Sequence, residues 1–362
     1  MNVKASVAVG IQSSELREFP FPDVPLDGGI LKVEAAGVCG ADVKSYKSNK
    51  SPRIMGHENV GIIDQIGSIA SQRWGIAEGD RVVLEEYLPC GHCSFCRTEE
   101  FRLCPGSDPR YDDFLRYGST GISRMPSLWG GFSQFMFLHP NSVVHKAPAG
   151  VEPNELTLAL PLANGYEWVC KRGNVGPGKR VVVIGPGQQG LACVLAAKIA
   201  GAALVVAVGL GRDRQRLEMA QILGADLTID IEHSDAIAIL RDITDGTGVD
   251  VVVDTAGGSE KTIISAVDML GQNGTLVQPS SGAPINNFPI AEVQQKCLAL
   301  LGVRGHSYSA VEWAIEVIRS RRYPLEKMQT HRFGLEAVDE AIRATGGEMG
   351  PDVIHVSVDP WS

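Results

Sequence analysis

Four cysteines lie within fifteen residues, in the stretch CGHCSFCRTEEFRLC at 90–104. Two residues separate each of the first three, so successive thiolates can turn onto one tetrahedral ion, and the fourth follows after seven residues. A bacterial ferredoxin cluster would instead have three residues before its last cysteine. Four thiolates with no open coordination position predict a closed, structural Zn²⁺ site. Its ligands would be Cys90, Cys93, Cys96 and Cys104.

A second candidate for chemistry is the glycine-rich stretch GPGQQG, residues 185–190, which follows an apolar strand pattern and opens a helix pattern. Gly185 would form the tight turn, Gly187 would let the backbone approach a pyrophosphate, and Gly190 would allow close packing of helix and strand. Gln188 and Gln189 would open the helix, whose unpaired N–H groups face the anion. The stretch therefore predicts a dinucleotide site.

The residues after the second strand bear on which dinucleotide is bound. Dinucleotide folds usually place an acid there to hold the adenosine ribose, but this chain has Gly209. Arginines follow at Arg212, Arg214 and Arg216, and guanidinium groups suit a 2′-phosphate, which favours NADP(H) over NAD(H). Two alternatives stay open: the arginines form the solvated face of the next helix, or Asp213 holds a ribose.

The elements that position these residues follow from the periodicity. After residue 180, apolar β-branched strands alternate with helical stretches, which predicts a doubly wound parallel sheet covered on both faces. The expected strands are 180–185, 203–209, 227–231, 249–255 and 274–279, and the expected helices begin at 188 and cover 214–223, 234–243 and 259–270. Residues 1–150 are rich in Gly and Pro with short alternating runs, which predicts an antiparallel, barrel-like β domain. Helical stretches at 310–320 and 335–345 and a strand at 352–358 would return to it.

Length and composition limit the functional classes. The 362 residues predict about two domains, and 44% hydrophobic residues are ample for buried cores. A net charge of −9 disfavours nucleic-acid binding, no apolar run suits a membrane helix, and no secretion signal is visible at the start. These features predict a soluble, cytoplasmic protein. Reduced thiols in that compartment, and four further scattered cysteines, disfavour disulfides.

Five motifs together give the chain a resemblance to the zinc-containing medium-chain alcohol dehydrogenases, such as sorbitol and threonine dehydrogenases. They are GVCGADV (37–43), GHENVG (56–61), GDRV (79–82), the four-cysteine lobe and the strand–GPGQQG–helix unit. The resemblance runs nearly end to end. It implies a GroES-like catalytic domain at 1–154 and 300–362, carrying the zinc lobe 90–104, and a Rossmann domain at 155–299.

The resemblance also implies a catalytic zinc held by Cys39 and His57, with Glu58 beside the histidine as a further ligand and Asp42 orienting the site. Such an ion would polarise a carbonyl or alkoxide oxygen during hydride transfer. The alternatives are that Cys39 is a buried structural residue and that His57 is a core histidine whose hydrogen bonds are satisfied within the protein.

Two positions depart from the family pattern. Relatives carry a third zinc ligand where this chain has Leu160, which cannot bind metal, and a relay hydroxyl where it has Ala41. Lys44 stands where some relatives have a relay histidine. The catalytic zinc therefore rests on Cys39, His57 and Glu58, or is lost altogether.

Other segments map onto the cofactor by the same resemblance. DTAGG (254–258) and QPSSG (278–282), with Ser280, would line the adenine and nicotinamide sides. GVRGH (302–306), with Val303 and Arg304, would run along the nicotinamide edge. The aromatic residues of 105–130 would either shape a substrate pocket or form a packed surface loop; they are Tyr111, Phe114, Tyr117 and Trp129.

The leading hypothesis is a zinc-dependent oxidoreductase that transfers hydride between a nicotinamide cofactor and a secondary alcohol or ketone. The first alternative is a zinc-independent reductase of an activated C=C bond, which would explain Leu160 and Ala41. The second is a nucleotide-binding protein with a degraded site. The expected partners are a small alcohol or ketone and other copies of the chain, as a dimer or tetramer.

Overall fold

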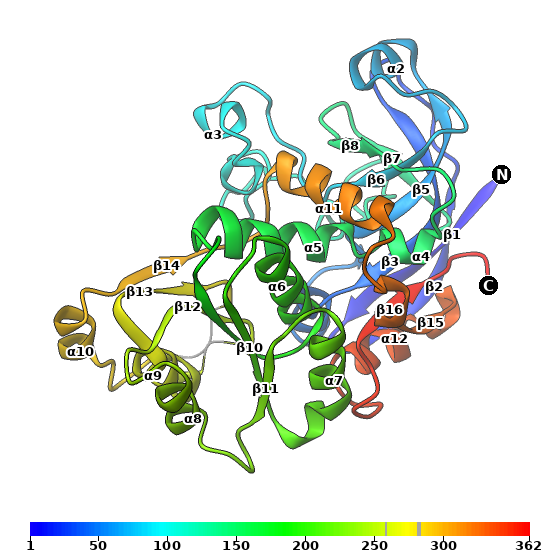
Figure 1. The fold of residues 1–362 in the computed structure, drawn as a ribbon. Coiled ribbons are helices and arrows are strands. Elements are labelled where there is room, and N and C mark those ends of the chain that lie inside the picture. Colours follow the sequence, from blue (N-terminus) through cyan, green and yellow to red (C-terminus); the bar gives the residue numbers. More distant parts are fainter. Residues whose placement is uncertain (258, 281–283) are drawn as a thin grey trace. The chain divides into compact units, whose positions relative to one another are not determined.

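The structure is a computed structural model that describes residues 1–257, 259–280 and 284–362. The chain forms two compact units (Figure 1). Unit 1 comprises Met1–Leu160 and Ser307–Ser362, and unit 2 comprises Pro161–His306. Among the described residues, no helix is both long enough and apolar enough to span a membrane.

Unit 1 is built on two β-sheets. A three-stranded sheet has the order β2-β1-β4, and a larger sheet has the order β15-β16-β3-β5-β6-β8, with β7 paired to β3. All of these pairings are antiparallel except β15 with β16. The strands are β1 (Asn2–Gly10), β2 (Ser13–Pro20), β3 (Gly29–Val38), β4 (Arg53–Ile54), β5 (Glu58–Ile66), β6 (Arg81–Leu84), β7 (Phe135–Leu138), β8 (Val144–Lys146), β15 (Gln329–Phe333) and β16 (His355–Val358).

Short helices connect or flank these strands. They are α1 (Gly40–Lys47), α2 (Ser68–Trp74), α3 (Ser94–Arg97), α4 (Pro153–Leu156), α11 (Tyr308–Ser320) and α12 (Val338–Thr345). One apolar cluster joins the inward side chains of both sheets to α12, and includes Ile30, Phe132 and Ile342. The predicted antiparallel β domain is confirmed, and so is the return of the C-terminal segments to it.

Unit 2 is a six-stranded parallel sheet of the order β11-β10-β9-β12-β13-β14. From β9 the chain first adds β10 and β11 on one side, and it then crosses back to add β12, β13 and β14 on the other side, which is the Rossmann strand order. The strands are β9 (Arg180–Ile184), β10 (Leu204–Gly209), β11 (Leu227–Asp230), β12 (Val249–Asp254), β13 (Leu270–Gln278) and β14 (Ala299–Gly302). The predicted doubly wound sheet is confirmed.

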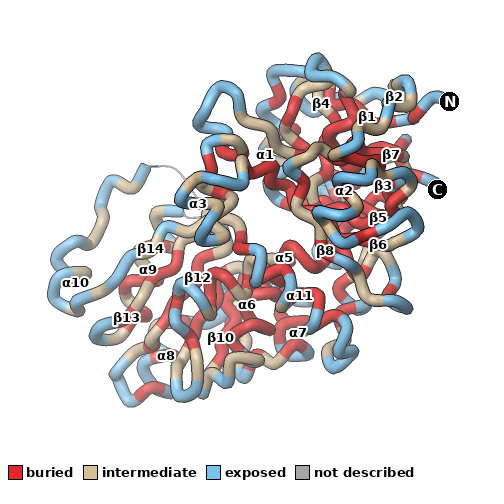
Figure 2. The backbone as a smooth tube through the Cα atoms, turned by 90° about the horizontal axis from the view of Figure 1, so that it is seen from above, coloured by how far each residue is buried: buried red, intermediate tan, exposed pale blue. Residues whose placement is uncertain are grey.

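The helices of unit 2 cover both faces of this sheet. Val182, Ile184 and Val206 pack against α8 and α9, whereas α6 contacts β9 and β10. Val181, Val183 and Val205, which alternate with them along the two strands, are equally buried. Figure 2 shows α6, β10 and β12 as buried segments and α10 as an exposed one. The helices are α6 (Gln188–Ile199), α7 (Arg214–Ile222), α8 (Ala236–Ile243), α9 (Glu260–Met269) and α10 (Ile290–Gln295), while α5 (Ala159–Tyr166) spans the boundary between the units.

Both expected domain boundaries need a correction. A boundary between 299 and 300 would divide β14, whose residues Ala299–Gly302 all pair with β13. Because this strand belongs to the parallel sheet, unit 2 extends to His306. The other boundary likewise moves, from 154 to Leu160.

Candidate functional site

The turn between β3 and α1 fixes a cysteine thiol. Cys39 is the N-cap of α1, its Sγ accepts a hydrogen bond from Ala41 N at 3.2 Å, and its own N–H donates to Asp42 Oδ2 at 3.0 Å. Two backbone donors at the start of the helix are thereby satisfied by side chains, as in a capping box. The same local geometry that starts the helix therefore holds the thiol in place.

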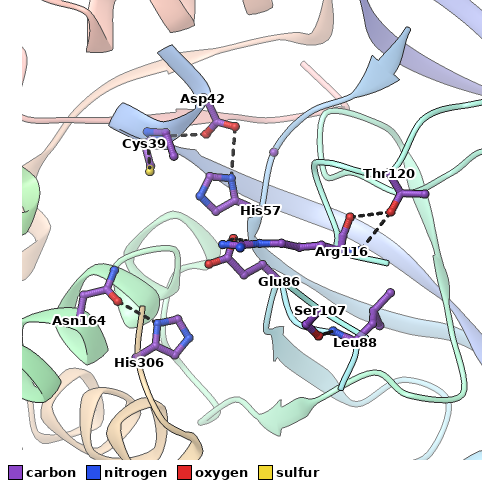
Figure 3. Close-up of polar contacts among 12 residues, drawn as sticks. Cys39, Asp42, His57, Glu86, Leu88, Ser107, Arg116, Thr120, Asn164 and His306 are labelled. Atoms are coloured by element: carbon purple, nitrogen blue, oxygen red, sulfur yellow. Dashed lines mark hydrogen bonds and ion pairs between the residues drawn. The ribbon is translucent and has the colours of Figure 1, made fainter. Parts of the chain in front are cut away.

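The histidine beside this turn is oriented by the same aspartate. His57 Nδ1 lies 3.2 Å from the other oxygen of Asp42, Oδ1, so Nε2 is left for a ligand (Figure 3). A carboxylate on one ring nitrogen is the usual support of a metal-binding histidine. The expected role of Asp42 in orienting the site fits this geometry.

Cys39, His57 and Glu58 form a Cys–His–Glu cluster in which one potential ligand atom from each lies within 4.8 Å of the others. Glu58 is buried at the start of β5. Thiolate, imidazole and carboxylate are the donor types of catalytic zinc sites with an open position, so these residues fit the ion. A purely structural role for Cys39 and His57 would leave this convergence unexplained.

The electrostatics of the cluster are those of a metal site without its ion. Burial raises the pKa of the Cys39 thiol above its ordinary value. Burial lowers the pKa of His57, but Asp42, Cys39 and Glu86 outweigh it and raise that pKa well above its ordinary value. Zinc binds the thiolate and the neutral imidazole, so a bound cation would lower both pKa values.

The structure offers no substitute ligand or hydroxyl at the positions that depart from the family pattern. Leu160 is buried, and an aliphatic side chain offers no ligand atom. Ala41 and Lys44 are both exposed on α1, and neither side chain carries a hydroxyl for a relay. Glu58 is the third member of the cluster.

The cysteine lobe, residues 90–104, brings its four thiols together, with all sulfur atoms within 4.8 Å of one another. Cys93 and Cys96 sulfurs are 3.5 Å apart and Cys90 and Cys96 sulfurs 3.9 Å apart. Tetrahedral zinc with 2.3 Å bonds would separate its sulfurs by about 3.8 Å. The thiols therefore already have the spacing of a closed zinc site.

The glycine turn of unit 2 forms a hollow of about 410 Å³ with the ends of β10 and β12. Gly185 has a φ of +89°, which a side chain would strain, and Gly187 faces open space. A Cβ on Gly190 would lie 1.9 Å from Gly185 O, so close helix–strand packing needs a glycine there. Gln188 and Gln189 occupy the first two helical positions of α6, as expected.

Sequence reasoning placed Thr255 within DTAGG (254–258), as part of the cofactor lining, but missed its contact with this turn. Thr255, at the end of β12, donates its hydroxyl to the carbonyl oxygens of Ile184 and Gly185, at 2.9 and 2.7 Å. It therefore ties two neighbouring strands to the turn. Its only signal in the sequence is a hydroxyl residue directly after an apolar strand.

The arginine prediction needs a correction. Arg212 lines the hollow together with Gly209, but Arg214 does not: its side chain is 84% exposed and pairs with Glu218. The second arginine of the hollow is Arg216, whose side chain is only 20% exposed. Helical spacing explains the difference, because residues two apart point to different sides of α7.

Asp213 also lines the hollow, with its carboxylate already engaged. One oxygen accepts a hydrogen bond from Leu210 N at 3.1 Å, and the other lies 3.2 Å from Arg216 Nη1. Asp213 thus closes the turn after β10.

The structure describes only part of the segments that the resemblance assigns to the cofactor. Ser280 donates its hydroxyl to Asp254 O at 3.3 Å, and Val303 N donates to Gln278 O at 3.1 Å. Gly258 of DTAGG, and residues 281 and 282 of QPSSG, lie outside the described residues.

The aromatic residues of 105–130 do not act as one group. Tyr117 and Trp129 are buried in the apolar core of unit 1, and Tyr111 is exposed. Tyr117 donates to Phe137 O at 2.9 Å, which links it to β7. For Tyr117 and Trp129, the pocket alternative is therefore excluded, because both side chains are packed in the core of unit 1.

A charged pair near the Cys–His–Glu cluster was not foreseen either. Glu86 follows β6 and pairs with Arg116 of the loop beyond the cysteine lobe (Figure 3). The sequence shows only two consecutive acids after an apolar strand, and nothing in it indicates the partner.

Comparisons with known proteins agree with this geometry. The family described as "Alcohol dehydrogenase GroES-like domain" matches residues 27–149, and the family "Zinc-binding dehydrogenase" matches residues 190–320. A probable alcohol dehydrogenase of Mycobacterium tuberculosis is 34% identical over 99% of this chain and 98% of its own. An erythritol/L-threitol dehydrogenase of Mycolicibacterium smegmatis is 29% identical over the same shares.

A solved structure shows the same fold. The crystal structure of an alcohol dehydrogenase from Thermotoga maritima superposes with a TM-score of 0.86 at 25% identity, and 99% of each chain is covered. The expected oxidoreductase, which transfers hydride between a nicotinamide cofactor and a secondary alcohol or ketone, is confirmed by these relatives. The chain belongs to the zinc-containing medium-chain alcohol dehydrogenase family.

Proposed function

We propose that the enzyme interconverts secondary alcohols and ketones at a zinc ion held by Cys39, His57 and Glu58. The observation that carries this proposal is the convergence of three ligand atoms within 4.8 Å, with Asp42 bonded to both the cysteine backbone and the histidine ring. Bound zinc supplies a Lewis acid for the alkoxide or carbonyl oxygen. Glu58 provides the anionic ligand that Leu160 cannot.

Metal content tests this proposal separately from turnover. We expect two zinc ions per chain as purified, and one after dialysis against a chelator, with loss of alcohol oxidation. Glu58→Gln should lose that zinc at a lower chelator concentration, because a neutral amide is a weaker ligand than a carboxylate. Glu155→Gln is the matched control, since Glu155 is equally buried but pairs with Arg321 elsewhere in unit 1.

One outcome would reverse the assignment. A fully active, freshly purified enzyme with one zinc, combined with normal turnover of Cys39→Ser, would exclude a catalytic zinc. Reduction of an activated C=C bond would then take its place.

We propose that the cysteine lobe holds the other zinc in a structural role. Its thiols have the required spacing, and the lobe is joined to α11: Glu99 accepts hydrogen bonds from Ser309 N and Oγ at 3.2 and 2.7 Å. Order in the lobe is coupled to the ion, because the four thiolates would otherwise repel one another. Loss of this zinc should therefore also loosen the start of α11.

We propose that the cofactor is NADP(H), with Arg212 and Arg216 at the 2′-phosphate. Both arginines line the hollow beside the glycine turn. Each charge-assisted bond contributes about 1.5–3 kcal/mol, so Arg212→Ala with Arg216→Ala should weaken NADPH far more than NADH. Arg214→Ala is the control, because Arg214 points into solvent and should leave both affinities unchanged. Tighter NADH than NADPH binding by the unmodified chain would refute this preference.

We propose that the chain assembles into a homo-oligomer through β14, and the dimer is the simplest form. This strand is one of the two edges of the six-stranded sheet, the other being β11, and it exposes Leu300, which is 41% accessible. An apolar edge strand is a template for pairing with a second copy. Ile222 on α7 is 49% accessible and lies outside this edge, so it is the control position for a substitution at Leu300.

We propose a cytoplasmic location on the basis of the thiols. All eight cysteines are free, including the four of the lobe, which bind zinc only when reduced. Detection of a lobe disulfide in the protein isolated from cells would argue against this location.

A further inference from the structure

The end of β3 lies unusually close to the start of β5, and Gly37 makes this approach possible. Gly37 and Glu58 are directly opposite each other in the antiparallel pairing of the two strands. Such residues usually have Cβ atoms about 4.5–5.5 Å apart, whereas a Cβ on Gly37 would lie 3.0 Å from Glu58 Cβ and 2.4 Å from Glu58 Oε2. The carboxylate of Glu58 therefore occupies space that any side chain at residue 37 would fill.

A histidine closes the other side of this space. His355 of β16 is fully buried, and its Cε1 would lie 3.2 Å from a Cβ on Gly37. The ring is held by Thr157: the Thr157 hydroxyl donates to Asn154 O at 2.6 Å, so it accepts from His355 Nε2 at 2.9 Å. Because this ring is fixed, a methyl group at residue 37 would displace the Glu58 side chain rather than the histidine.

Displacement of Glu58 would matter because its carboxylate belongs to the Cys–His–Glu cluster. One carboxylate oxygen lies within 4.8 Å of the ligand atoms of Cys39 and His57. Glu58 is 2% exposed, so the carboxylate has no open route into water. Among the residues that the structure describes, Glu58 is the only third ligand that this cluster has. Metal binding at the cluster therefore depends on where this one carboxylate lies.

We propose that Gly37 is a positioning residue for the catalytic zinc: the space beside its Cα lets Glu58 take its place as the third ligand. The inference rests on the proposed function, and it adds a residue that has no side chain to contact substrate or metal and acts through Glu58. The φ of Gly37 lies outside the left-handed region, so alanine suits its backbone. The contacts with Glu58 and His355, rather than backbone strain, oppose a side chain at this position.

Zinc retention tests this inference without relying on turnover. The unmodified chain and Gly37→Ala are dialysed against a graded series of chelator concentrations, and the zinc per chain is measured at each. The lobe zinc serves as the internal reference, and the catalytic zinc is the one lost first. Gly37→Ala should lose it at a chelator concentration at least about tenfold lower, because loss of a group that orients a ligand weakens metal binding about 10–100-fold.

Two further variants separate positioning from a general loss of packing. Gly61→Ala is the matched control: Gly61 lies on the same strand as Glu58, and a Cβ there would lie 2.2 Å from Lys32 O and 2.9 Å from Leu31 Cγ. This variant should lower Tm and leave zinc retention unchanged. In the Glu58→Ala background, adding Gly37→Ala should change zinc retention less than about twofold, because the side chain that it displaces is already absent.

The outcomes distinguish this inference from the function on which it rests. A single zinc in the unmodified chain would overturn both. Two zinc ions in the unmodified chain, with equal or tighter retention in Gly37→Ala, would overturn this inference alone, and so would an equal loss of zinc affinity in the Glu58→Ala background. If Gly37→Ala does not fold, recovery of the fold on adding Glu58→Ala supports the contact between the two residues, and a failure to recover overturns it.

Discussion

Alanine at two glycines of the phosphate-binding turn should separate cofactor binding from folding. Gly187 and Gly190 lie three residues apart, and the space around them differs. A Cβ on Gly187 would meet no atom within 4 Å, whereas a Cβ on Gly190 would lie 1.9 Å from Gly185 O and 2.9 Å from Thr255 Oγ1. The first position faces the hollow, and the second faces the protein.

The magnitudes follow from these surroundings. Gly190→Ala forces apart a helix and a turn that Thr255 holds, and overpacking of this kind costs about 1–3 kcal/mol. The contact of 1.9 Å with a backbone oxygen puts this cost at its upper end, and better helix propensity returns up to about 1 kcal/mol, so the net loss is about 2 kcal/mol, or about 4–8 °C in Tm. Gly187 has a φ of −69°, which alanine adopts freely, so its Tm should stay within about 2 °C.

Cofactor affinity should respond in the opposite order, with a larger loss for Gly187→Ala than for Gly190→Ala. A methyl group on Gly187 stands where the pyrophosphate approaches the backbone, and loss of one charge-assisted hydrogen bond there weakens binding at least about tenfold. The assays are a thermal melt without cofactor and a fluorescence titration with NADPH. The reasoning fails if Gly187→Ala binds NADPH like the unmodified chain, or if Gly190→Ala melts at the unmodified temperature.

Three further predictions concern other parts of the chain. Cys93→Ser should release the lobe zinc and lower Tm, measured by metal analysis and calorimetry, and a variant with normal melting and full activity would contradict the lobe site. Burial lowers the pKa of His145, but its hydrogen bonds to Glu312 and Glu85 outweigh this and raise it. Protonated His145 therefore stabilises the fold below about pH 6.5, and this is lost as pH rises through the folded pKa, so His145→Gln should flatten the pH dependence seen in urea unfolding. Leu300→Lys should yield monomers in sedimentation analysis, since a charge on an edge strand blocks pairing, and an unchanged assembly would exclude the β14 edge.

Much of the framework could be predicted from local pattern. The strands of unit 2 are runs such as RVVVI and VDVVVD, buried on both faces, and their apolar character is visible without any knowledge of partners. The lobe cysteines and the glycine turn are equally local, because their spacing sets which atoms one short segment can bring together. The convergence of Cys39, His57 and Glu58 was foreseen only through family resemblance.

The tertiary structure decided everything that depends on which distant segments meet. The positions of Arg214 and Arg216 around α7 place Arg216 in the hollow and Arg214 in solvent. Tyr117 and Trp129 are packed in the apolar core of unit 1 and therefore do not line a pocket. Glu86 and Arg116 are thirty residues apart, and only the fold brings them together, because Tyr117 N donates to Glu86 O at 3.0 Å and so holds the loop bearing Arg116 beside the segment after β6. The physical reason is common to these cases: spacing along the chain fixes contacts within one turn, whereas burial and long-range pairing choose partners across the fold.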